Sequence, residues 1–106
     1  MKVIKHLSEM IEDTIDCAED YIKAAMEYKS EYPEYPEVAK TLAMLSENEM
    51  SNMNSLHSVV TKVISEYRKT NGEPPAPMMA VYDYLHKKYI DHAAQVKAMQ
   101  AMYKEI

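Results

Sequence analysis

Proline and glycine are confined to two short stretches of this chain, and this distribution constrains the fold more than any other feature. The residues concerned are Pro33, Pro36, Gly72, Pro74, Pro75 and Pro77. Because Pro interrupts helices and Gly weakens them, the long segments without either residue favour helix. A chain of 106 residues with one glycine is also a poor candidate for hairpin-rich β architecture, whose turns use glycine.

The three segments between these stretches have the composition and the ends of helices. Each is rich in Ala, Leu, Met, Glu and Lys, which are strong helix formers. The second segment closes with Arg68 and Lys69 followed by Gly72, and basic residues before a glycine are typical of a helix end. We therefore predict helices over residues 3–30, 36–70 and 77–104.

Apolar residues recur along one face of each segment at about 100° per residue. These faces hold Ile4, Leu7, Ile11, Ile15, Ala18, Ile22 and Ala25, then Val38, Leu42, Leu45, Leu56, Val60, Val63 and Tyr67, then Met78, Val81, Leu85, Tyr89, Val96, Met99 and Tyr103. Turns of about six residues make sequential helices antiparallel neighbours. The expected fold is all-α, an antiparallel up-down-up bundle of three long helices, with residues 1–106 in a single domain.

Charge and cysteine content exclude several classes of function. The net charge of −5 and the scattered positive residues argue against nucleic-acid binding. No apolar run approaches the roughly 18 residues of a membrane span, and the first residues lack the apolar core of a secretion signal. The single cysteine, Cys17, excludes an intramolecular disulfide framework and suits a reducing compartment. The expectation is a soluble, cytoplasmic protein.

Four polar residues interrupt or flank the apolar faces. Glu49 falls near the middle of the second face, and Asn52 lies on its flank three residues later. His92 stands between Tyr89 and Val96 on the third face, and Glu19 lies on the shoulder of the first. A carboxylate near a core is costly unless it is paired, hydrogen-bonded, protonated or bound to a metal.

The turn positions predict that these four residues share one layer of the bundle. With the first turn centred near residues 32–34, Glu19 is level with Glu49, and with the second centred near Gly72, His92 is level with Asn52. Carboxylates and an imidazole inside a helical bundle can hold iron or manganese. The alternative is a buried Glu–His hydrogen bond that fixes the helix register.

A resemblance to a known family supports the metal hypothesis. Residues 45–57 read LSENEMSNMNSLH, which resembles the second-helix signature of ferritin-like proteins, where Glu-x-x-His joins a Glu one helical hairpin upstream. Glu19 and Glu49 stand 30 residues apart, close to the spacing in the short ferritin-like proteins of encapsulin compartments. The resemblance covers about residues 10–65 and implies that Glu19 and Glu49 are metal ligands.

This sequence departs from the family at the expected histidine, where it carries Asn52. Asn is a weak neutral ligand, and His92 is expected to compensate from the third helix. A ferritin-like di-metal centre takes ligands from four helices, so a three-helix chain would need a symmetric dimer. The resemblance implies a metal-binding protein that oxidises or stores iron. The alternative is a non-catalytic helical module that oligomerises or binds a partner, with a decayed metal site.

Two further patterns concern a pair of histidines and the outer surface of the first helix. The second turn places His57 level with His86, so that these residues either pair at the shoulder of the bundle or are solvated. A second apolar line on the first helix, beside the main face, is formed by Val3, Met10, Cys17, Ala24 and Tyr28. An apolar arc this wide usually meets more than its own chain, so a homodimer or larger symmetric oligomer is expected.

Overall fold

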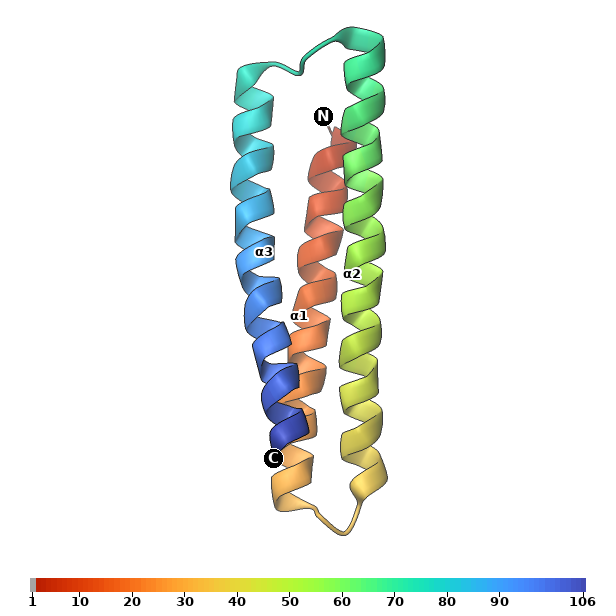
Figure 1. Ribbon diagram of the computed structural model, residues 1–106, viewed down its shortest axis with the longest axis vertical. Helices are drawn as coiled ribbons and strands as arrows, with labels where there is room; N and C mark the ends of the chain where they lie inside the picture. Colours follow the sequence, from red (N-terminus) through yellow and green to blue (C-terminus); the bar gives the residue numbers. More distant parts are fainter. Residues whose placement is uncertain (1) are drawn as a thin grey trace.

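The computed structural model describes residues 2–106, and the regular elements in that range are all helices. They are α1 (Lys2–Glu31), α2 (Pro36–Asn71) and α3 (Ala76–Glu105). These bounds lie within one residue of the predicted ones, so the expectation of an all-helical chain with three long helices is confirmed. Figure 1 shows α1 and α3 running in the same direction and α2 in the opposite one. The molecule is a rod of 58 × 19 × 18 Å.

The helix ends follow from the Pro and Gly positions. Pro36 stands in the first turn of α2, where a missing N–H costs nothing. Gly72 ends α2 with φ of 77°, a left-handed conformation that favours glycine, and its N–H donates to the Arg68 carbonyl at 3.0 Å. Pro75 then precedes α3, whose first turn holds Pro77. No helix within residues 2–106 is long and apolar enough to cross a bilayer.

The core is organised around α1. This helix packs against α2 along most of its length and against α3 over a smaller area, whereas α2 and α3 contact each other little. The buried residues of α1 are spaced alternately by four and three, which is the spacing of a coiled-coil seam: Ile4, Ser8, Ile11, Ile15, Ala18, Ile22 and Ala25.

The inward faces of α2 and α3 differ in part from the predicted ones. Val38 and Val81 are 38% and 58% exposed, so their predicted core positions are wrong. In the first half of α2 small residues face the core in place of Val38: Ala39 and Ser46 are buried there, and the Ser46 hydroxyl donates to the Ala18 carbonyl at 2.7 Å. On α3, Tyr82 packs against the core in place of Val81.

Ser46 also fixes the register of the three helices. It bonds Ala18 on α1 and accepts a hydrogen bond at 2.9 Å from the Gln100 side chain on α3. Ser46 therefore lies at the level of Ala18 and Glu19, and Glu49 lies about one helical turn farther along α2. The predicted alignment of Glu19 with Glu49 differs from this register by that turn, because the small residues, not the centre of the turn, decide how α1 and α2 meet.

Candidate metal site

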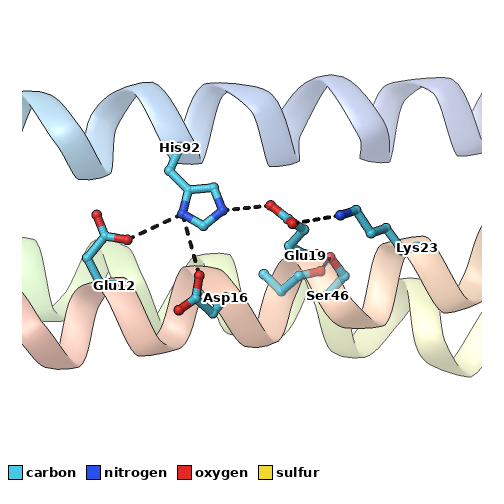
Figure 2. A network of polar contacts seen from close by, with 7 residues as sticks. Glu12, Asp16, Glu19, Lys23, Ser46 and His92 are labelled. Atoms are coloured by element: carbon cyan, nitrogen blue, oxygen red, sulfur yellow. Dashed lines mark hydrogen bonds and ion pairs between the residues drawn. The ribbon is translucent and has the colours of Figure 1, made fainter.

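His92 reaches from α3 toward α1 and contacts three carboxylates there (Figure 2). Its Nε2 lies 2.7 Å from Glu19 Oε2, and its Nδ1 lies 3.3 Å from Glu12 Oε2 and 3.7 Å from Asp16 Oδ1. The imidazole side chain is 19% exposed, and the Glu12 and Glu19 side chains are 23% and 24% exposed. The group therefore sits at the edge of the α1–α3 contact.

The local sequence explains why these residues meet. Glu12, Asp16 and Glu19 are spaced by four and three, so that they form one row on α1 beside its buried seam. His92 stands between Tyr89 and Val96, which are both fully buried. Since α1 and α3 run in the same direction, the imidazole is held against the middle of the row (Figure 2).

The two carboxylate contacts of the ring favour its protonated form. A neutral imidazole carries one N–H, whereas an imidazolium can donate from both nitrogens. Burial by itself would lower the pKa of His92, but the hydrogen bonds to Glu19 and Glu12 outweigh it and leave the pKa raised. In the metal-free protein a proton on His92 therefore balances part of the negative charge.

Glu19 is held between two cations. Lys23 Nζ lies 2.8 Å from Glu19 Oε1, one helical turn away, and His92 approaches the other oxygen. These hydrogen bonds, that of Lys23 first, lower the pKa of Glu19. Both contacts favour the charged form of Glu19, which accepts hydrogen bonds from the imidazole and from Lys23.

One carboxylate oxygen of Glu12, Oε1, is buried and has no hydrogen-bond partner among the described residues, while Oε2 faces His92. One ligand atom each from Glu12, Asp16 and His92 lie within 4.8 Å of one another. Asp16 is 64% exposed, so the group is open to solvent on one side. Two carboxylates and one imidazole are a suitable ligand set for iron, manganese or zinc.

The structure brings together two of the four predicted site residues. Glu19 and His92 are in direct contact. Asn52 is exposed, and its amide donates instead to Glu49 on the same helix at 3.3 Å. Glu49 is half-buried on α2, one turn from the level of Glu19.

Sequence reasoning missed Glu12 and Asp16. It compared α1 with α2 and α2 with α3, which are neighbours in sequence, and left out the parallel pair α1 and α3. The signal that could have found them is the spacing of four and three that links Glu12, Asp16 and Glu19 on one helix face.

His57 and His86 form a second group, on α2 and α3. Their rings stack with centroids 5.2 Å apart and both residues are half-buried, so of the two alternatives, pairing and solvation, the structure shows pairing. Burial, with a smaller contribution from His86, lowers the pKa of His57. Cys17 and Asp83 are exposed.

Comparisons with protein-family models, with curated proteins and with solved structures found no match to this chain. Function is therefore inferred from the chemistry of the α1–α3 group.

Proposed function

We propose that this protein is a ferritin-like metal-binding bundle that holds one divalent ion, Fe²⁺ or Mn²⁺, between α1 and α3. The observation that carries the proposal is the set of three ligand atoms from Glu12, Asp16 and His92, beside a buried and unpartnered Glu12 oxygen. A buried carboxylate oxygen without a partner costs free energy, and a bound cation would remove that cost.

The residues of this group divide into ligands and a positioning residue. Glu12, Asp16 and the His92 Nδ1 atom would bind the ion. Glu19 faces the other ring nitrogen at 2.7 Å and would accept its N–H, which fixes the tautomer and makes Nδ1 a better donor. The resemblance implied that Glu19 is itself a ligand, and this proposal gives it the supporting role.

Metal binding would replace a proton by an ion. In the imidazolium form, which the two carboxylate contacts favour, Nδ1 donates to Glu12, and it must lose this proton before it can bind a metal. Three protein ligands leave coordination positions open to water on the exposed Asp16 side. Such a site suits the uptake or holding of an ion.

The proposal includes a ferritin-like, up-down-up arrangement of the helices. The proposed site nevertheless differs from the ferritin-like pattern. The family pattern would place a second set of ligands on α2, at Glu49 and position 52. Here Asn52 is exposed and bonds to Glu49. The proposal is therefore one ion per chain, held by α1 and α3.

Titration with Mn²⁺ tests the proposal. The signal of free Mn²⁺ in electron paramagnetic resonance should disappear on binding, with a stoichiometry of one ion per chain. Glu12→Gln should weaken the affinity at least about tenfold, since it removes a ligand charge while keeping the side-chain shape. Glu49→Gln is the matched control and should bind as the wild type does. If the wild type bound neither Mn²⁺ nor Fe²⁺, the proposal would be wrong, and the group would be an ion-pair network between α1 and α3.

A second candidate function, self-association, is favoured by the outer surface of α1. Ala24 of the predicted apolar line is half-buried. The other four members are exposed: Val3 (46%), Met10 (40%), Tyr28 (36%) and Cys17. Exposed apolar side chains aligned along one helix are typical of a contact surface. We propose that two copies pair through this line of α1.

Cross-linking at Cys17 tests the pairing. Cys17 lies at the middle of α1 and is the only cysteine, so a symmetric contact centred on this line brings two copies of it together. We expect a short bismaleimide to give a covalent dimer at micromolar concentration, and light scattering to show twice the 12.2 kDa chain mass. Met10→Glu should abolish both results, and Cys17→Ser should abolish the cross-link alone. A 12.2 kDa wild-type species would exclude the pairing.

A further inference from the structure

We infer that His57 and His86 form a second metal site, which binds Zn²⁺ and joins α2 to α3. This site is separate from the α1–α3 group and does not depend on it. The proposal rests on the position of the two imidazoles on facing helices and on their lack of other polar partners among residues 2–106.

The two rings come from different helices and face each other. Their centroids are 5.2 Å apart and their planes are inclined by 23°. No hydrogen bond or ion pair within residues 2–106 engages a ring nitrogen of either residue. The nitrogen lone pairs are therefore available, and rotation of the rings about χ2, which is a soft torsion, can turn one nitrogen of each toward a shared ion.

Two tyrosine rings of α3 pack against the pair. Tyr89 is fully buried, and its ring lies edge-on to both imidazoles, with centroids at 5.9 Å from His57 and 5.2 Å from His86. Tyr82 stacks on His86, with ring centroids 5.6 Å apart.

The donor type selects the ion. Neutral imidazoles without a carboxylate favour Zn²⁺, Ni²⁺ and Cu²⁺ over Mn²⁺, and Zn²⁺ is the one among them without redox chemistry. Burial lowers the pKa of His57 and so favours its neutral, ligating form. α2 and α3 have the smallest contact of the three helix pairs. A bound ion would therefore add a link between the two helices that contact each other least.

Zn²⁺ binding is tested in a protein that carries His92→Gln, so that the α1–α3 group does not contribute. Calorimetric titration with Zn²⁺ should show one ion per chain, and the melting temperature should rise with Zn²⁺ and fall back with a chelator. Adding His57→Gln or His86→Gln should each lower the affinity at least about tenfold, whereas His6→Gln, at an exposed histidine of α1, should not. Equal Zn²⁺ affinity in all four proteins would overturn the proposal.

Histidine footprinting in the wild type gives an independent measurement that needs no variant. Diethyl pyrocarbonate modifies neutral imidazoles that have a free ring nitrogen. We expect Zn²⁺ to protect His57 and His86 together and to leave His6 unprotected. Modification of His57 and His86 at rates that Zn²⁺ does not change would exclude the site, whether or not Mn²⁺ binds between α1 and α3.

Discussion

His92→Gln is expected to lower the affinity for Mn²⁺ at least about 100-fold. Loss of a group that merely supports a ligand typically costs about 10–100-fold, and this substitution removes a ligand together with the residue that bridges α3 to α1. Glu12, Asp16 and Glu19 would remain on one helix without a donor from α3. Titration of the wild type and the variant under the same conditions, with the helix content checked by circular dichroism, measures the effect.

The pH dependence of Mn²⁺ binding by the wild type is a second test of His92 as a ligand. The pKa of His92 is raised by Glu19 and Glu12 over the effect of burial, and the metal must displace that proton. The Mn²⁺ affinity should therefore rise as the pH rises through the raised pKa, and the slope should be smaller in His92→Gln. In the metal-free protein the sign is opposite: the ion pairs stabilise the fold where His92 is protonated and its carboxylate partners are charged, and this stability is lost as the pH rises through the raised pKa of His92.

Asn52→His separates this site from the one that the resemblance implies. The substitution introduces the histidine of the ferritin-like signature that residues 45–57 resemble, but position 52 is exposed and Asn52 bonds to Glu49. We expect the Mn²⁺ affinity of Asn52→His to equal that of the wild type. A gain of tenfold or more, lost again in Glu49→Gln, would place the ion at α2 and contradict the α1–α3 site.

The helices were predictable because local chemistry decides them. Pro36 and Gly72 mark helix ends by their own conformational limits, whatever the rest of the chain does. The buried seam of α1 was also predictable apart from Ser8, because its isoleucines repeat at the helical period. Ser8 was missed because a serine carries no hydrophobic signal, and its burial depends on the helices that cover it.

The site was only half predictable, because it depends on distances between helices. The helical period identified His92 as a polar residue within an apolar face, and the turn positions placed Glu19 in the same layer of the bundle. The contacts of Glu12 and Asp16 with His92 depend on how the parallel pair α1 and α3 meets, and neither turn relates these two helices directly. The offset of Glu49 from Glu19 depends on the register of α1 and α2, where Ser46 contacts Ala18, a contact that a pattern of large apolar residues does not reveal.

Ile15→Ala is expected to lower the free energy of unfolding by roughly 2–5 kcal/mol, the usual cost of truncating a buried isoleucine. Ile15 is fully buried on α1, the helix against which both others pack, so neither neighbour can close the cavity without losing contacts with the other. Domains of this size have about 5–15 kcal/mol in total. Urea unfolding measures the loss, with Val59→Ala, at a 43% exposed position on α2, as the control. A loss equal to that of the control would mean that α1 is not the central helix of the core.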